Sequence, residues 1–253
     1  MREGLRFSAA HPFRSGNVHF HDPLTTWSSN TKPSLYTPGE DLGENRIYSC
    51  LVISPASRVI SGFRTIKELL ESERDAIKAH RSLYVNGKIL HRDISPANII
   101  ITHPETANGF KGMLIDLDLA KVRDSEPSGA RHQTGTMQFM TVEVLRKMGH
   151  TYRHDLESFF HVLLWILLWG WKIGSFKNIA GIKWCHMIVN GLEDIMEEFP
   201  EALDVVKPLC LKIRKILFPF DKDEYMNIGT HIGDPDQLYN PIIAAFNKTI
   251  SEL

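Results

Sequence analysis

The residues best suited to chemistry lie in one polar loop, His91-Arg92-Asp93-Ile94-Ser95-Pro96-Ala97-Asn98, enclosed by two short apolar runs. Such runs predict strands, so the pattern indicates strand, loop, strand. Within the loop a carboxylate, Asp93, is followed five residues later by an amide, Asn98. A carboxylate can orient and deprotonate an attacking hydroxyl, and an amide oxygen can help hold Mg²⁺ near phosphates. The spacing therefore indicates phosphoryl transfer, against the plainer interpretation of a polar turn between strands.

A second carboxylate follows at the end of a predicted hairpin. Residues 99–102 are predicted as a strand, 103–112 as its connection and 113–115 as the returning strand, which ends at Asp116. Alone, an Asp at a strand end is more often a turn residue than a ligand. Its spacing from Asp93 favours the ligand interpretation.

A helix is predicted just before the polar loop, over residues 65–87. Thr65 and Glu68 have the form of a capping box, with the acid three residues after the cap. Apolar residues recur at helical spacing along the segment, and Gly87 is a suitable end. A core-facing helix is the expected structure.

Further helices are predicted in the second half of the chain. Residues 155–169 are apolar on every face, which is typical of a buried helix, and Asp155 suits its N-cap. Amphipathic helices are predicted over 203–217, broken by Pro208, and over 238–250.

Composition limits the class of protein. The 253 residues, 43% of them hydrophobic, can bury a sizeable core as one large domain or two. A net charge of −1 and a pI near 6.9 do not indicate nucleic acid or a membrane surface as a partner. Three scattered Cys without Cys-x-x-Cys spacing fit a reducing, intracellular setting and argue against zinc. We find no signal peptide, and the apolar run 159–171 is too short to span a membrane. We expect an intracellular protein, with cytoplasm and nucleus both open.

Taken together, the motifs resemble the fungal-type protein kinase domain family. The loop matches the kinase pattern H-R-D-x-x-x-x-N, with Ser95 in place of the usual Lys, as is typical of that family. The resemblance covers about residues 46–220. The matching stretches are Leu90-His91-Arg92-Asp93-Ile94-Ser95, Ile115-Asp116-Leu117-Asp118-Leu119-Ala120, Gly135-Thr136, Phe139-Met140, Glu143-Val144-Leu145 and His154-Asp155-Leu156-Glu157-Ser158-Phe159-Phe160.

The resemblance implies an α+β, protein kinase-like fold, mainly the α-helical large lobe with its hinge over residues 46–253. Residues 1–45 would be an irregular segment with an incomplete N-terminal β lobe. They contain no G-x-G-x-x-G, and Lys32, followed by Pro33, is a poor candidate for the Lys that pairs with ATP phosphates. The small lobe is therefore expected to be truncated or replaced.

The resemblance also implies roles in the polar loop. His91, Arg92 and Asp93 would be catalytic, with Asp93 acting on the acceptor hydroxyl. Asn98 and Asp116 would hold Mg²⁺ and bind ATP.

Downstream residues would support these groups. Thr136 would hydrogen-bond near the catalytic Asp, and Glu143 would anchor the lobe through an ion pair whose Arg partner the sequence leaves open. Asp155 would tie down the backbone of the catalytic loop. Asp118 replaces the Gly of the kinase Asp-Phe-Gly motif, which puts in doubt any flipping of this segment.

Residues 121–135 form a polar stretch that predicts a mobile loop. Thr134, Ser125 and Ser128 are candidate phosphosites, because Arg92 could pair with a phosphate. For each of them a solvated loop hydroxyl is the favoured interpretation.

The implied activity is that of a protein serine/threonine kinase, which moves the ATP γ-phosphate to a protein hydroxyl. A protein substrate or binding partner is expected, and the oligomeric state stays open. The missing Gly-rich loop and Lys favour a pseudokinase or scaffold instead, whereas the intact set Asp93, Asn98 and Asp116 favours activity. A small-molecule phosphotransferase would share the Asp-to-Asn spacing, but Arg92 and residues 135–143 argue against it.

Overall fold

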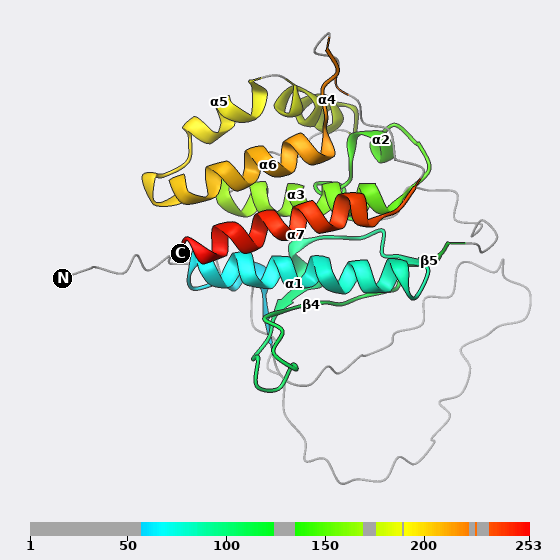
Figure 1. Cartoon of the computed structure of the whole chain (residues 1–253). Helices are drawn as coiled ribbons and strands as arrows, with labels where there is room; N and C mark the ends of the chain where they lie inside the picture. The colour runs from blue at the N-terminus through cyan, green and yellow to red at the C-terminus, as the bar shows by residue number, and fades with distance from the viewer. Residues whose placement is uncertain (1–56, 124–134, 169–175, 189, 223–225, 227–232) are drawn as a thin grey trace, which may run out of the picture. The chain divides into compact units, whose positions relative to one another are not determined.

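The computed structural model describes residues 57–123, 135–168, 176–188, 190–222, 226 and 233–253 (Figure 1). The chain divides into two compact units, residues 1–54 and 55–253. All described residues belong to the second unit. The predicted irregular segment 1–45, its boundary at residue 46 and the candidate phosphosites lie outside the described residues.

Helix α1, Ile66–Val85, confirms the first predicted helix, which runs without a break. The Thr65 side chain accepts a hydrogen bond from the Glu68 N–H at 3.1 Å, as its cap position predicts. The Glu68 carboxylate does not turn back to Thr65, because it accepts from the Arg64 N–H and from the Arg58 guanidinium, both at 2.6 Å. The start of α1 is therefore fixed by a local charge pair as well as by its cap.

Two small antiparallel sheets hold the two ends of the polar loop. Strand β2 (Ile89–Leu90) precedes the loop and pairs with β5 (Lys121–Val122). Strand β3 (Ile99–Ile101) follows the loop and pairs with β4 (Gly112–Leu114) and with β1 (Arg58–Val59). The predicted hairpin is confirmed, with each strand ending one residue earlier than expected. Short 3₁₀ turns, η1 and η2, cover Ile60–Gly62 and Pro96–Asn98.

Strand β4 crosses close to α1, and this contact requires a glycine. A Cβ atom at Gly112 would overlap the backbone carbonyl of Ser72. The Ser72 hydroxyl donates to the Lys111 carbonyl at 3.0 Å, and the Asp75 carboxylate accepts from the Lys111 N–H at 2.9 Å. The hairpin is thus attached to α1 through its backbone.

Helix α3, Tyr152–Leu168, is the predicted buried helix, but it begins three residues before Asp155. The prediction that Asp155 caps it was wrong. The Thr151 N–H instead donates to His154 Nδ1 at 2.9 Å, which satisfies a donor at the helix start. The Asp155 carboxylate is therefore available for other partners.

The remaining helices complete an α+β fold that is mostly helical, as predicted. The expected break at Pro208 is confirmed, because a new helix starts at Lys207 with Pro208 in its first turn. Figure 1 shows α7 alongside α1, and Arg81 on α1 pairs with Asp236 at the start of α7 at 2.5 Å. The elements are α2 (Val142–Leu145), α4 (Phe176–Met187), α5 (Gly191–Glu197), η3 (Glu201–Val206), α6 (Lys207–Leu217) and α7 (Asp236–Ser251).

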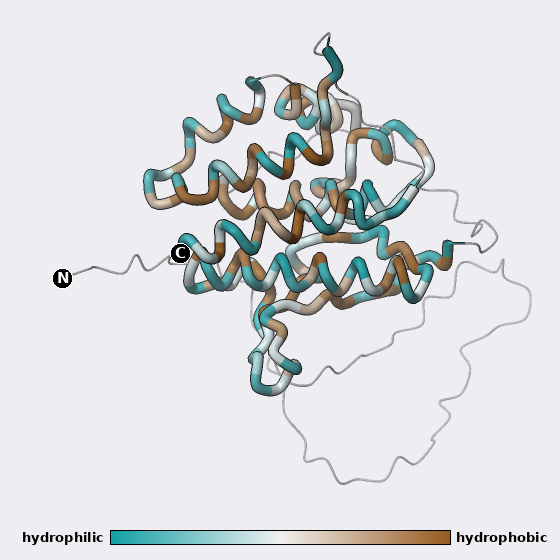
Figure 2. Tube along the Cα trace, viewed as in Figure 1, coloured by the Kyte–Doolittle hydropathy of each residue, from teal (hydrophilic) through white to brown (hydrophobic). Residues whose placement is uncertain are grey.

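Apolar side chains from the helices form one large core. Figure 2 shows apolar and hydrophilic residues alternating along α1, α6 and α7, as expected for helices with one buried face. Within the described part of the chain, no helix combines the length and apolar character needed to cross a membrane.

One carboxylic acid, Glu73 on α1, lies within this core. Its side chain is fully buried, and neither carboxyl oxygen has a hydrogen-bond partner among the described residues. Burial raises the pKa of Glu73 well above its ordinary value of 4.5. The folded protein therefore keeps a proton that the unfolded chain loses above pH 4.5. As a result, the stability of the fold declines as pH rises from that value toward the raised pKa.

Replacing Glu73 with Met should raise the free energy of unfolding by about 1–3 kcal/mol near neutral pH, because an unpaired buried carboxyl is removed. Urea unfolding between about pH 5 and 8.5 measures this, and the decline with pH should become shallower. Glu73→Gln is the matched control, since it removes the titrating group but keeps a buried polar one. It should lose the pH dependence with a smaller gain in stability. A Met variant less stable than the wild type at neutral pH would contradict this account.

Candidate active site

The carboxylate of Asp93 is held in place from two sides. Its Oδ1 accepts hydrogen bonds from the Thr136 N–H at 2.7 Å and from the Thr136 hydroxyl at 2.8 Å. The Asn98 amide nitrogen donates to the Asp93 carbonyl at 2.8 Å and to its Oδ2 at 3.2 Å. Three donors therefore fix the orientation of this side chain.

The second acidic residue lies next to Asn98 because the two backbones are joined. The Ile115 N–H donates to the Asn98 carbonyl at 2.9 Å, and Asp116 follows directly. Asp116 has a left-handed backbone, with φ of 66°, which is uncommon for a residue with a side chain. Since the Asn98 NH₂ group binds Asp93, its amide oxygen remains as the ligand atom. Asn98 and Asp116 thus offer oxygen ligands of the kind that Mg²⁺ prefers.

His91 connects these two parts of the site. It is fully buried, and burial lowers its pKa, with a backbone bond to Ile115 and nearby Asp155 opposing the effect. Its Nδ1 accepts from the Asp93 N–H at 3.3 Å, so its Nε2 donates to the Ile115 carbonyl at 2.9 Å. The imidazole joins the polar loop to Ile115, the residue before Asp116.

Asp118, in the place of a Gly, fits its position without strain. The left-handed residue of this segment is Asp116, whereas Asp118 has a negative φ. Its N–H donates to Asp116 Oδ1 at 3.2 Å. The absence of a glycine therefore leaves the backbone around Asp116 undisturbed.

Asp155 brings together three segments of the chain. Its fully buried carboxylate accepts from the backbone N–H groups of His91 and Arg92, each at 3.1 Å. It also bonds to the imidazoles of His80, at 2.9 Å, and His150, at 2.7 Å. Arg92 has φ of 70°, so these bonds stabilise an uncommon backbone conformation beside Asp93.

The surroundings of Asp155 favour its ionised form. Burial by itself would raise its pKa, but the charges and hydrogen bonds of His150 and His80 hold that pKa far below the ordinary value of 3.8. The hydroxyl of Tyr239 on α7 lies 2.8 Å from His80 Nδ1. Since His80 Nε2 donates to Asp155, Nδ1 accepts from Tyr239. A chain of hydrogen bonds thus runs from α7 to the catalytic loop.

Glu143, whose partner the sequence leaves open, binds two side chains at the start of α3. His154 lies 2.8 Å and Arg153 3.6 Å from its Oε2. Arg153 also donates to Glu157 at 2.9 Å and to the Leu217 carbonyl at 2.7 Å. Burial lowers the pKa of His154, which the bond to Glu143 opposes. These contacts attach α2 to the core.

Several of these partners were missed by sequence reasoning, although signals for some exist. Arg153, Glu157 and His161 are spaced four residues apart in a mainly apolar helix, which places buried polar groups along one face. His80 occupies a core position at helical spacing on α1. No local sequence pattern indicates Tyr239 as a partner, because 159 residues separate it from His80.

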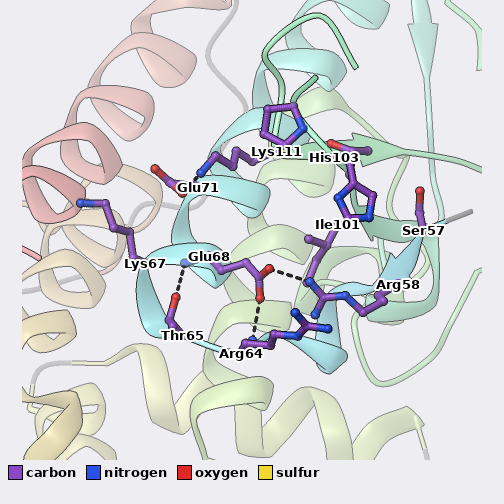
Figure 3. Close-up of a pocket in the computed structure, with 12 residues that line it drawn as sticks. Ser57, Arg58, Arg64, Thr65, Lys67, Glu68, Glu71, Ile101, His103 and Lys111 are labelled. Carbon is purple, nitrogen blue, oxygen red and sulfur yellow. Dashed lines mark hydrogen bonds and ion pairs between the residues drawn. The ribbon is translucent and has the colours of Figure 1, made fainter. Parts of the chain in front are cut away.

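A cavity of about 460 Å³ lies elsewhere, between the start of α1, β1 and the hairpin (Figure 3). The residues that line it do not belong to the catalytic set. Arg58 is paired with Glu68 at 2.6 Å and Lys111 with Glu71 at 3.0 Å, so part of its positive charge is already neutralised. The chemistry above therefore does not depend on this cavity.

No group of three or more His, Cys, Asp or Glu suited to a metal ion occurs among the described residues. Asn98 and Asp116 could supply two oxygen ligands. Such a pair suits Mg²⁺, which commonly takes one or two protein ligands together with substrate phosphates and water.

The comparisons with known proteins found similarity to protein kinases. The family model for fungal protein kinases matches residues 1–167, a range that includes the N-terminal segment left out by the motifs above. The chain is 34% identical over 106 residues to the Protein kinase and PP2C-like domain-containing protein of Oryza sativa subsp. japonica. The aligned segment covers 38% of this chain and 16% of that protein. The protein of the same name from Arabidopsis thaliana is 36% identical over 93 residues, 32% of this chain and 14% of that protein. The matched segment is thus a small part of either relative.

Asp155→Asn should destabilise the fold by about 3–5 kcal/mol, because four donors lose their buried carboxylate. Urea unfolding near neutral pH measures this loss. The carboxylate stabilises the fold above its ordinary pKa of 3.8 and ceases to do so as pH falls toward its lowered folded value. The difference between variant and wild type should therefore shrink below that pH.

Tyr239→Phe is the matched control for this variant. It removes only the hydrogen bond between Tyr239 and His80 and should lower the free energy of unfolding by about 0.5–1.5 kcal/mol. The way in which stability changes at acid pH should stay as in the wild type. Equal stability of Asp155→Asn and the wild type near neutral pH would exclude the central role of this carboxylate.

Proposed function

Because this chain belongs to the fungal protein kinase family, we propose that it is a phosphotransferase of the protein serine/threonine kinase type. It would move the γ-phosphate of ATP to a hydroxyl group of a protein. The observation that supports this most is the connected set Asp93, Asn98 and Asp116. Hydrogen bonds join Asn98 to Asp93 and to Ile115, the residue before Asp116, and Thr136 fixes the Asp93 carboxylate.

Each residue of this set would have a separate role in phosphoryl transfer. Asp93 would orient the acceptor hydroxyl and take its proton, and its three donors hold it ready with little reorganisation. Asn98 and Asp116 would hold Mg²⁺ through their oxygen atoms. ATP would supply the phosphoryl group, and Mg²⁺ would offset the charge on its oxygens.

The sheet next to Asn98 offers a surface for the base of the nucleotide. Val59, Ile100 and Met113 are aligned across β1, β3 and β4 and so share one face. Val59 is 46% and Met113 37% exposed, whereas Ile100 between them is buried. Gly112, on the opposite row, contacts α1. Exposed apolar side chains beside the proposed phosphate-binding residues suit a flat purine ring.

Residues 135–145, the acceptor-side segment, favour a protein acceptor over a small molecule. The segment is attached to Asp93 through Thr136 and to α3 through Glu143. A segment that is held at both ends beside Asp93 can support a polypeptide. The alternative is a scaffold without transfer, which the missing Gly-rich motif of the sequence favours.

Asp116→Ala should abolish Mg²⁺-dependent ATP binding, measured by titration calorimetry, because a ligand oxygen is lost. Asp93→Ala should leave that binding largely intact and reduce phosphate transfer to an acceptor protein such as casein by about 100- to 10,000-fold, since the proton acceptor is gone. Transfer of ³²P from ATP measures the second effect.

Glu105→Ala, an exposed position on the hairpin loop, is the control and should change neither quantity. Unchanged transfer in Asp93→Ala would exclude Asp93 as the base. If wild-type protein fails to bind Mg²⁺ and ATP at about millimolar concentration, the scaffold becomes the better description.

A further inference from the structure

A lysine lies buried beneath the acceptor-side segment. Lys183 on α4 is fully buried, and its ammonium group donates to the Met140 carbonyl at 2.5 Å. Its Nζ is also 3.1 Å from Nδ1 of His161 on α3. A buried lysine is costly and is rarely kept without strong partners. Its main partner here is the backbone of the segment that supports Asp93.

His161 faces the neighbouring carbonyl of the same segment. It is fully buried, and its Nδ1 lies 3.3 Å from the Phe139 carbonyl. Lys183 and His161 therefore contact two consecutive carbonyls in the middle of the segment. Its two ends are held separately, by Thr136 on Asp93 and by Glu143 on α3.

One nitrogen of His161 cannot serve both of its neighbours at once. To accept from the Lys183 ammonium, Nδ1 must carry no proton, whereas to donate to the Phe139 carbonyl it must carry one. When Lys183 is charged, its ammonium group donates to the Met140 carbonyl and to an unprotonated His161 Nδ1. When Lys183 is neutral, His161 Nδ1 can carry a proton and donate it to the Phe139 carbonyl. Loss of the Lys183 proton thus weakens the bond to the Met140 carbonyl and permits a bond from His161 to the Phe139 carbonyl.

The groups around Lys183 place this change near neutral pH. Burial lowers its pKa to about 7, and the charge of Glu157 on α3 opposes that effect. Burial, and then the Lys183 charge, lower the pKa of His161 well below its ordinary value. Arg153 on α3 and His186 on α4 also act on His161 in the same direction.

Further charges face this cluster from the segment and from α3. Glu143 binds Arg153, and Glu157 Oε1 lies 3.9 Å from His161 Nε2. Glu157 also accepts from the Val142 N–H at 3.4 Å, at the start of α2. The acids remain paired with Arg153, so Lys183 is the group whose charge changes against the segment.

We propose that Lys183 is a positioning residue for the acceptor side of the site. Acting with His161, it holds the middle of the acceptor-side segment through a charge-assisted bond while it carries a proton, and its bond to the Met140 carbonyl weakens when that proton is lost. Binding of the acceptor protein then weakens as pH rises. This inference rests on the proposed phosphotransferase function for its kinetic consequence, but the change in the segment itself does not need activity.

Hydrogen exchange of the amides 137–141 tests the change in the segment without any activity. In the wild type their protection, corrected for intrinsic exchange and compared with the amides of α3, should fall about tenfold between pH 6 and 8.5, as one charge-assisted hydrogen bond is lost. Lys183→Arg stays charged over this range and should keep its protection. Equal protection of the wild type at both pH values would overturn the proposal, whether or not the variants fold.

Kinetics with the acceptor protein test the consequence for the site. The wild-type KM for the acceptor should rise about tenfold over the same range, with a smaller change in kcat. Lys183→Arg should have a flat profile, and Lys183→Met should have the high KM at every pH. A purely structural role would lower stability in Lys183→Met and leave the pH profile of KM unchanged. If the wild type transfers no phosphate at any pH, the proposed function fails, and the exchange result still decides the role of Lys183.

Discussion

The buried carboxylate of Asp155 is the interaction on which the rest of the site depends. A charge in the core is tolerated only when enough donors replace water, and here two backbone N–H groups and two imidazoles do so. Two of these donors belong to His91 and Arg92, so the carboxylate that needs them also determines the path of the catalytic loop. The left-handed backbone of Arg92, and the direction in which Asp93 points, follow from this requirement.

Asp155 binds the backbone of the polar loop, and a row of polar groups on α3 binds the acceptor-side segment in a similar way. Arg153, Glu157 and His161 lie four residues apart on one face of this helix, and each is buried. They bind Glu143, the Val142 N–H and the Phe139 carbonyl. Both loops of the site are therefore attached to the same rigid helix, which fixes their geometry relative to each other.

Local features were predictable from the sequence. The Thr65 cap, the hairpin between β3 and β4 and the new helix at Pro208 depend on neighbouring residues, whose preferences act over a few positions. Asp155 shows the limit of this reasoning. An Asp before an apolar run suits an N-cap, but it suits a buried acceptor for a distant loop equally well, and only the folded backbone decides between them.

The candidate site was predictable in part, for a related reason. The spacing of Asp93, Asn98 and Asp116 carries their chemistry within one stretch of sequence, and the structure brings them together. The partners that hold them do not follow a local pattern. Glu143 binds Arg153 and His154, which no spacing rule specifies, and His80 is completed by Tyr239 from the far end of the described chain.

The sequence separations of these contacts have a consequence for the order of folding. Glu143 and His154 are 11 residues apart, and Met140 and Lys183 are 43 apart, so the acceptor side closes short loops. His80 and Tyr239 are 159 residues apart. Since closing a longer loop costs more entropy and local contacts form sooner, the acceptor side is expected to assemble first. During synthesis on the ribosome, the catalytic loop therefore lacks its last support until residue 239 has emerged, and a nascent chain cannot complete the site ahead of the rest of the fold.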